Sequence, residues 1–274
     1  MDLGISGKVA FVAGGSQGMG RATAIMLAAE GCKVGVVARG QANIDTVVEE
    51  IRDAGGIAIG IAADLIGREG VNAAVAALTA EFGIPDIVVG QTNDATAGNF
   101  GDTTDEDYER VFQVFTMSQV YLARATVPAM QKKKWGRYVH IGSANGKEPQ
   151  LSHPHILANA IRPSTVAFLR VLAHEVAADG VTINVVGPGL TDTPGLMKYV
   201  TGKMKITPEQ AVDWAAGRPV SGIQGGQGAA DIPVGRIGKP EEVAAMVCFF
   251  ASAHAAYITA SWIGVDGGRH HYTF

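Results

Sequence analysis

The stretch AGGSQGMG at residues 13–20 decides how this chain folds. The apolar run 9–12 before it is typical of a buried strand, and residues 21–30 after it carry apolar side chains at helical spacing. In such a strand–turn–helix unit, glycines let the backbone approach a pyrophosphate, and the helix N-terminus points free amides at the phosphates. The stretch therefore predicts a dinucleotide site. Because a glycine pattern alone also fits a simple tight turn, the prediction depends on the rest of the chain.

Strands and helices alternate along the remainder of the chain. This alternation predicts the α/β class, with one doubly wound parallel sheet, a Rossmann fold, helices on both faces and ligands beyond the carboxyl ends of the strands. We expect a single domain over residues 1–274. The strands are expected at residues 33–38, 57–62, 86–89, 138–141, 181–186 and 262–265, and the helices at 43–54, 71–82, 104–129, 157–178 and 241–251.

Residues 194–235 interrupt the alternation. They read as irregular except for a short helix that begins at Thr207, where Pro208 and Gln210 fit a capping box. An irregular segment of this length exceeds the ordinary connections of compact domains. We therefore expect residues 194–235 to form a lid over the substrate.

Composition and charge narrow the functional classes. With 22 basic and 26 acidic residues the net charge is −4, which argues against nucleic acid as the main partner. Cys32 and Cys248 lie far apart in expected core elements, so we expect buried thiols, no disulfide and no metal site. Residues 243–265 are long and apolar enough to resemble a membrane span, but polar residues such as His254 interrupt them, and we expect no membrane partner. The N-terminus lacks the features of a signal peptide, so a cytoplasmic location is expected.

Further motifs recur at the ends of the expected strands and near the C-terminus. Together with the glycine loop, they resemble the short-chain dehydrogenase/reductase family, in its 3-oxoacyl-acyl-carrier-protein-reductase-like branch, over essentially the whole chain. The resemblance implies an oxidoreductase that transfers a hydride between a nicotinamide cofactor and a carbonyl, alcohol or activated alkene. The motifs are Asp64-Leu65, the turn Pro188-Gly189 with Thr191 and Thr193, GRIGKPEEVA at 235–244 and VDGG at 265–268.

The same resemblance implies where the cofactor lies. The glycine loop would hold the pyrophosphate, Asp64 and Leu65 would lie beside the adenine, and the proline-glycine turn would hold the nicotinamide end. The expected cofactor-binding residues are Gly14, Ser16, Gln17, Gly18, Met19, Gly20, Arg39, Asp64, Leu65, Arg162, Pro188, Gly189, Thr191 and Thr193.

Arg39 bears on which dinucleotide binds. An acidic residue at the end of the second strand would bond a ribose 2′-hydroxyl and repel a 2′-phosphate, and this chain has arginine there instead. A guanidinium suits a phosphate. The sequence therefore favours NADP, with NAD as the alternative. The alternative is that Arg39 stacks on adenine or faces solvent.

The active-site residues depart from the family pattern. Ser143 matches the catalytic serine that hydrogen-bonds the substrate oxygen. An alignment anchored on residues 173–175 puts Arg162 at the position of the catalytic lysine, Ala158 at that of the tyrosine and Phe115 at that of the asparagine. Arg162 is able to hold the cofactor ribose, but a guanidinium does not exchange protons near neutral pH. Alanine transfers no proton at all.

Two histidines are candidates for the missing proton donor. His155 precedes Arg162 by seven residues, a spacing that resembles the tyrosine–lysine spacing of the enoyl reductases of fatty-acid synthesis, and His153 lies just before it. Histidine exchanges protons near neutral pH. The alternative is that both are loop residues at a subunit interface, and Tyr199 is a more remote candidate. The expected catalytic residues are Ser143, Arg162 and His155.

Two other functional classes stay open at this point. One is a non-redox enzyme on the same fold, such as a lyase, dehydratase, isomerase or dehalogenase-like protein. The other is a catalytically silent nucleotide-binding protein. The expected helices 104–129 and 157–178 carry apolar residues widely around their surfaces. Because family members pair these helices between subunits, the resemblance implies a homotetramer or homodimer.

Overall fold

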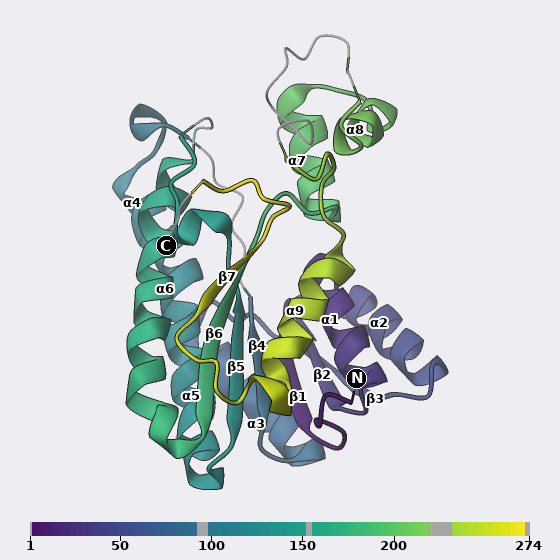
Figure 1. Cartoon of the computed structure of the whole chain (residues 1–274), viewed down its shortest axis with the longest axis vertical. Helices are drawn as coiled ribbons and strands as arrows, with labels where there is room; N and C mark the ends of the chain where they lie inside the picture. Colours follow the sequence, from purple (N-terminus) through teal and green to yellow (C-terminus); the bar gives the residue numbers. More distant parts are fainter. Residues whose placement is uncertain (1, 92–97, 152–154, 219, 221–231, 272–274) are drawn as a thin grey trace.

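A parallel sheet forms the centre of the computed structural model, which describes residues 2–91, 98–151, 155–218, 220 and 232–271. Within those residues the sheet has seven strands in the order β3-β2-β1-β4-β5-β6-β7, all paired in parallel (Figure 1). This confirms the predicted doubly wound Rossmann sheet. The strands are β1 (Val9–Ala13), β2 (Lys33–Ala38), β3 (Ile57–Ala62), β4 (Ile87–Gly90), β5 (Gly136–Ile141), β6 (Val181–Pro188) and β7 (Trp262–Val265).

Helices cover both faces of this sheet, as the alternation predicted. Helices α1, α2 and α9 pack on one face, and α3, α5 and α6 pack on the other. The helices are α1 (Gly18–Ala29), α2 (Gln41–Asp53), α3 (Arg68–Phe82), α4 (Asp105–Phe112), α5 (Ser118–Lys133), α6 (Ile156–Val176), α7 (Pro194–Met204), α8 (Pro208–Ala215) and α9 (Pro240–Ala251).

Strand β1 shows why its sequence is continuously apolar. All five of its residues are buried. Ala10 and Val12 pack into the core beneath α1 and α9, whereas Phe11 and Ala13 pack into the core on the opposite face. A parallel strand that is covered on both sides has no solvent-facing positions, so it carries no polar alternation.

The segment expected to be irregular contains a helix that the sequence interpretation missed. Residues 194–204 form α7, which begins at the N-cap Thr193, whose Oγ1 accepts a hydrogen bond from the Leu196 amide at 3.1 Å, with Pro194 in the first turn. The predicted helix at Thr207 is confirmed as α8, with both capping-box hydrogen bonds present. Figure 1 shows α7 and α8 beyond the carboxyl ends of the strands. Residues 221–231 lie outside the described part of the chain.

The structure also tests the expected helix at 104–129, the apolar segment 243–265 and the two cysteines. The helix expected at 104–129 consists of α4, a π-helical turn over Gln113–Met117 and α5. Residues 243–265 form the end of α9, a turn and β7, as predicted, and both cysteines are buried and unpaired. One helical stretch, Ile156–Asp179, is long and apolar enough by composition to span a membrane, and here it packs on the sheet through α6.

Candidate active site

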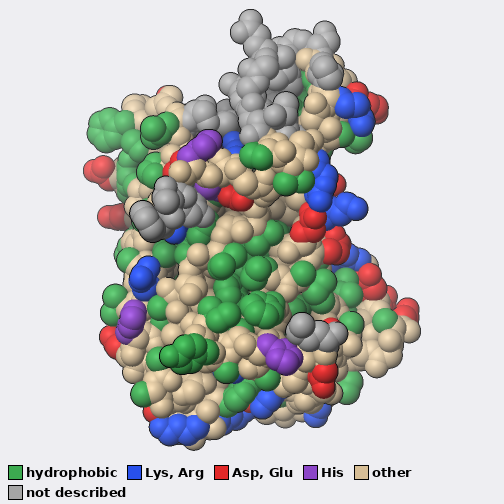
Figure 2. All heavy atoms as spheres, viewed as in Figure 1, with side chains coloured by type: hydrophobic (Ala, Val, Ile, Leu, Met, Phe, Trp, Pro, Cys, Tyr) green, Lys and Arg blue, Asp and Glu red, His purple; other side chains and the backbone are tan. Residues whose placement is uncertain are grey.

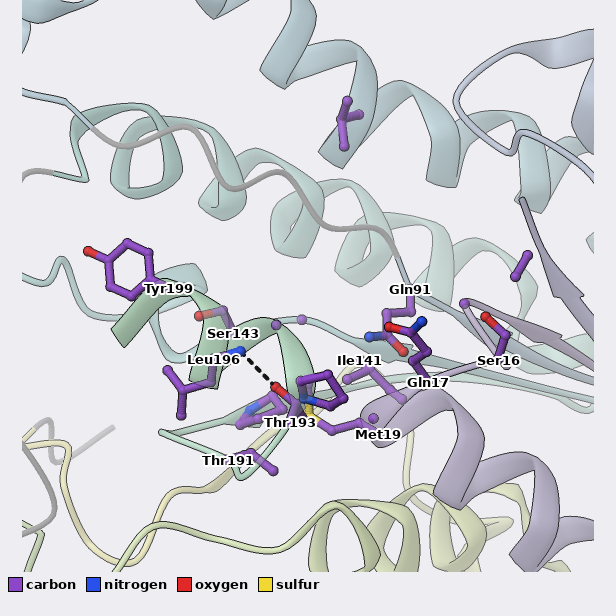
Figure 3. A pocket seen from close by; sticks show the side chains of 18 of the residues that line it. Ser16, Gln17, Met19, Gln91, Ile141, Ser143, Thr191, Thr193, Leu196 and Tyr199 are labelled. Atoms are coloured by element: carbon purple, nitrogen blue, oxygen red, sulfur yellow. Dashed lines mark hydrogen bonds between the residues drawn. The ribbon is translucent and has the colours of Figure 1, made fainter. Parts of the chain in front are cut away.

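A cavity of about 690 Å³ lies at the carboxyl edge of the sheet, between the loops that follow the strands and helix α7 (Figure 3). It brings together predicted residues that are as much as 179 positions apart in sequence, from Gly14 to Thr193. Nearly every predicted site residue lines it. These are Gly14, Ser16, Gln17, Gly18, Met19, Arg39, Asp64, Leu65, Ser143, His155, Arg162, Pro188, Gly189, Thr191 and Thr193.

Gly20 is the exception, and its expected role in cofactor binding stays a prediction. It does not line the cavity; it packs against the glycine loop instead. A Cβ at Gly20 would lie 2.2 Å from the carbonyl oxygen of Gly14. Glycine is required there because α1 approaches the loop backbone too closely for any side chain.

The glycine loop is shaped to receive a pyrophosphate. Gly14 and Gly18 have φ of +63° and +54°, a backbone conformation that favours glycine. The N-cap residue Gln17 makes no side-chain cap hydrogen bond, and the first turn of α1 carries no acidic residue. The amides at this end of α1 are therefore left for an anion, as they are in dinucleotide sites.

Gln91, at the end of β4, also fits a bound polar group. Its Oε1 is buried and has no hydrogen-bond partner among the described residues. The side chain lies against the glycine loop, because a Cβ at Gly14 would meet Gln91 Oε1 at 3.5 Å, and Gln91 lines the cavity. Since a buried polar atom without a partner is costly, a ligand in the cavity would relieve it. Sequence analysis assigned no role to Gln91.

The two residues expected near the adenine stand at the ends of neighbouring strands. Arg39 directly follows β2 and is exposed, and no partner for its guanidinium is found among the described residues. Asp64 follows β3, and its Oδ1 accepts a hydrogen bond from the Ile66 amide at 3.1 Å. This turn holds the Asp64 carboxylate at the cavity wall. Arg39, about 25 positions earlier in the chain, lines the same cavity.

The proline-glycine turn joins the end of β6 to α7. A Cβ at Gly189 would lie 2.8 Å from Asp266 Cα, so the turn runs tightly against the chain that follows β7. The Thr191 hydroxyl donates to the carbonyl of Gly189 at 3.2 Å. Thr193 Cγ2 would stand 3.0 Å from a Cβ at Gly18. Through this contact the start of α7 sits directly beside the glycine loop.

Ser143 follows β5 and is held by a network that sequence reasoning missed. Its hydroxyl donates to Asn145 Oδ1 at 3.3 Å, and the Asn145 amide N–H donates back to Ser143 Oγ at 3.4 Å. Asn145 Nδ2 in turn donates to Asn159 Oδ1 at 2.7 Å, and Asn145 lines the cavity. Asn145, itself held by Asn159, therefore fixes the side chain of Ser143.

Arg162 lies on α6, where its guanidinium stacks on the ring of Phe115 at 4.1 Å from the ring centre. The π-helical turn carries this buried phenylalanine. Behind them, burial and the positive charge of Arg162 lower the pKa of His140 to about 3. The arginine is thus a fixed cation in the cavity wall, while His140 stays neutral at physiological pH.

His155 and Tyr199 meet at the end of the cavity that contains the serine. His155 Nε2 lies 3.3 Å from Tyr199 Oη, and the ring centroids are 5.7 Å apart. His155 precedes α6, Tyr199 projects from α7, and Ala158 at the family's tyrosine position lines the same cavity. His153 lies outside the described residues. Figure 3 draws Tyr199 at the same end of the cavity as Ser143, away from Ser16 of the glycine loop.

Comparison with known proteins identifies the family. The family model described as short chain dehydrogenase matches residues 8–203. The chain belongs to the short-chain dehydrogenase family. A second model, described as Enoyl-(Acyl carrier protein) reductase, matches residues 213–270.

Individual members of the short-chain dehydrogenase family align over nearly their whole length. A short-chain reductase protein from Streptomyces niveus is 34% identical over 96% of this chain and 94% of its own. A 3-oxoacyl-acyl-carrier-protein reductase from Escherichia coli is 31% identical over 98% of this chain and 99% of its own. The crystal structure of L-sorbose reductase from Gluconobacter frateurii, complexed with NADPH and L-sorbose, has a TM-score of 0.90 and 28% identity, covering 99% of this chain and 100% of that chain.

These relatives are reductases, and this short-chain dehydrogenase is accordingly an oxidoreductase. Its fold and family agree with the resemblance found in the sequence motifs. Ser143, Ala158 and Arg162, which the motif alignment placed at the catalytic positions, all line the cavity.

Proposed function

We propose that the chain is an NADP-dependent short-chain dehydrogenase/reductase that transfers a hydride between the dinucleotide and a carbonyl, alcohol or activated alkene. The observation that carries the proposal is one cavity that joins a phosphate-binding glycine loop to Ser143 and Arg162. The uncapped N-terminus of α1 and the unpaired Oε1 of Gln91 fit a dinucleotide there.

Arg39 supports the choice of NADP. It stands in the cavity wall at the end of β2, where an acidic residue would select a 2′-hydroxyl. A guanidinium binds a phosphate through charge-assisted hydrogen bonds. Similar proteins point the same way, because the sorbose reductase and an actinorhodin polyketide ketoreductase, which is 29% identical, have been solved with NADPH.

The proposal gives each catalytic residue a defined task. When bound, the reduced dinucleotide supplies the hydride. Ser143 hydrogen-bonds the substrate oxygen, Arg162 holds the cofactor ribose with a permanent charge, and His155 is the source of the proton for the substrate oxygen. Arg162 also stabilises negative charge that develops on that oxygen.

The remaining parts of the proposal concern the lid, the assembly and the location. Residues 194–235 would cover the substrate, which agrees with the position of α7 in the cavity wall. A cytoplasmic location agrees with the buried, unpaired thiols of Cys32 and Cys248.

A homodimer or homotetramer agrees with two apolar surfaces. The helical stretch Ile156–Asp179 is apolar, yet only 28% of its most apolar part is buried within the chain. Figure 2 shows hydrophobic side chains gathered over α9 and β7, where Ile263 is exposed on the edge strand of the sheet. An edge strand has unpaired backbone groups that a second copy is able to cover.

The test combines cofactor binding with turnover. Titration with NADPH and NADH should show tighter binding of NADPH, and a panel of carbonyls, alcohols and enones should contain a substrate. Ser143→Ala should lower kcat with little change in dinucleotide Kd, whereas Arg162→Ala should weaken dinucleotide binding as well. Binding without turnover of any compound would favour a catalytically silent protein, and turnover without dinucleotide would favour a non-redox enzyme.

A further inference from the structure

The chain after β7 returns across the edge of the sheet that holds the cavity. In Figure 1 this chain, drawn in yellow, crosses above the strand ends toward the side of the sheet that carries α6. We call residues 266–271 the C-terminal strap. It begins beside the proline-glycine turn, where a Cβ at Gly189 would lie 2.8 Å from Asp266 Cα. It reaches the loop between β5 and α6, where the His271 amide donates to Glu148 Oε2 at 3.1 Å. The strap thus contacts both loops.

The side chain of His270 fastens the strap to the end of β7. A carboxylate only accepts hydrogen bonds, so His270 Nδ1 carries the proton that it shares with Asp266. The His270 ring packs edge-on against Trp262 of β7, with the ring centroids 6.4 Å apart. The side chain of His270 is only 3% exposed, and that of Asp266 is 11% exposed. The imidazole is therefore held in one orientation by a buried acceptor and by its packing.

The other nitrogen of the His270 ring faces the loop between β5 and α6. His270 Nε2 lies 3.4 Å from Gln150 Nε2, and these residues are 120 positions apart in the chain. Because Nδ1 holds the proton directed at Asp266, the lone pair of Nε2 in the neutral ring accepts a hydrogen from the Gln150 amide. The strap is thereby bonded to the end of the loop that begins at Ser143.

Hydrogen bonds continue from Gln150 to the serine. The Gln150 N–H donates to Asn159 Oδ1 at 3.0 Å, and Asn159 Nδ2 donates to the Gln150 carbonyl at 3.0 Å. A backbone N–H only donates and a carbonyl only accepts, so this pair fixes which way the Asn159 carboxamide points. Asn159 Oδ1 also accepts from Asn145 Nδ2, which leaves Asn145 Oδ1 for the Ser143 hydroxyl. The orientation of that hydroxyl therefore depends on where the backbone of Gln150 lies.

We propose that His270 is a positioning residue that holds, through Gln150, the loop that orients the Ser143 hydroxyl. The proposal rests on the proposed oxidoreductase function and adds a residue that sets the geometry of its serine. His270 is not part of the described lining of the cavity, so it acts through the loop and not on the substrate. A displacement of about 1 Å at a reacting group costs as much as about 100-fold in rate, so loosening the loop is felt in turnover.

His270→Ala and Gln150→Ala test the proposal together. Each alone should lower kcat about tenfold, while the Kd for NADPH stays within threefold of wild type because both variants keep Asp266 against Gly189. If the two side chains act through one contact, the double variant should lose about tenfold as well, and not about 100-fold. His254→Ala, at an exposed histidine in the turn after α9, is the control and should change neither quantity.

A second measurement uses the protein without dinucleotide or substrate. Hydrogen exchange followed by mass spectrometry reports how firmly the loop is held. In His270→Ala the amides of residues 145–150 should exchange roughly two- to tenfold faster, the effect of losing one hydrogen bond. The amides of α1 should be unchanged in the same sample, whereas a general loss of stability would speed exchange in both segments. His254→Ala should leave both segments as in wild type.

The outcomes separate this proposal from the proposed function. Single variants with turnover within threefold of wild type would overturn the role of His270 while leaving the oxidoreductase intact. An additive loss in the double variant, or a loss explained by weaker NADPH binding, would overturn it too. If the wild type turns over nothing, the oxidoreductase proposal fails. Exchange alone then decides whether His270 holds the loop: faster exchange at residues 145–150 supports this, and unchanged exchange refutes it.

Discussion

Gly20→Ala is the substitution whose effect follows most directly from the structure. The added Cβ would lie 2.2 Å from Gly14 O and 2.7 Å from Gly14 C, and real Cβ contacts essentially never fall below 3.0 Å. The obstruction is backbone, so either the loop or the start of α1 must move by almost 1 Å. Strain of this kind costs about 1–3 kcal/mol of folding free energy, and about 1 kcal/mol lowers Tm by about 2–4 °C in a domain of this size.

The displacement should damage binding more than stability. The amides at the start of α1 would no longer meet both phosphates at hydrogen-bond distance, and we expect the dinucleotide Kd to rise at least tenfold. Thermal unfolding and a fluorescence titration with NADPH measure the two effects. Gly101→Ala is the matched control, because no atom of the described residues lies within 4 Å of a Cβ added at Gly101, and its φ is not positive. If Gly20→Ala behaves like Gly101→Ala in both assays, the packing role assigned to Gly20 is refuted.

Four further outcomes are expected. Arg39→Asp should reverse the preference between NADPH and NADH in paired titrations; an unchanged ratio would show that another group discriminates. Phe115→Leu removes the ring beneath Arg162, a contact worth about 0.5–2 kcal/mol, so the dinucleotide Kd should rise about two- to thirtyfold. His155→Ala should lower turnover roughly 100-fold, and retention of wild-type rates would eliminate it as proton source. Val171→Glu, on the outer face of α6 where the valine is 59% exposed, should shift the mass by light scattering toward the monomer; a monomeric wild type would contradict the proposed assembly.

The sequence predicted the sheet well because parallel strands leave a strong local signal. A strand buried on both faces is continuously apolar, so β1 was predicted from its own residues. The loop after β1 was assigned as a dinucleotide site only with the support of motifs elsewhere in the chain. Helix α7 was missed because Gly195 and Gly202 lower its helix propensity. Its start signals, Thr193 and Pro194, were present, but Thr193 had already been interpreted as a cofactor residue.

The sequence predicted a site residue only where its type and its place in a motif were enough to identify it. Ser143 and Arg162 follow from motif spacing, and both line the cavity. Asn145 was missed because its importance lies in a partner, Asn159, that only the tertiary fold brings within 2.7 Å. The contact between His155 and Tyr199 joins residues 44 positions apart on different elements, which no local pattern encodes.

The side chains around Arg162 fit one another chemically. A guanidinium is planar and delocalised, so it stacks on the Phe115 ring, which a lysine ammonium does less well. The phenylalanine ring therefore suits an arginine at this place. Burial, together with the same permanent charge, keeps His140 neutral, and the guanidinium is itself unable to give up a proton. Ala158, on the same helix, carries no proton donor either, so the proposed proton exchange falls to a side chain outside α6, such as His155, which precedes that helix and lines the cavity.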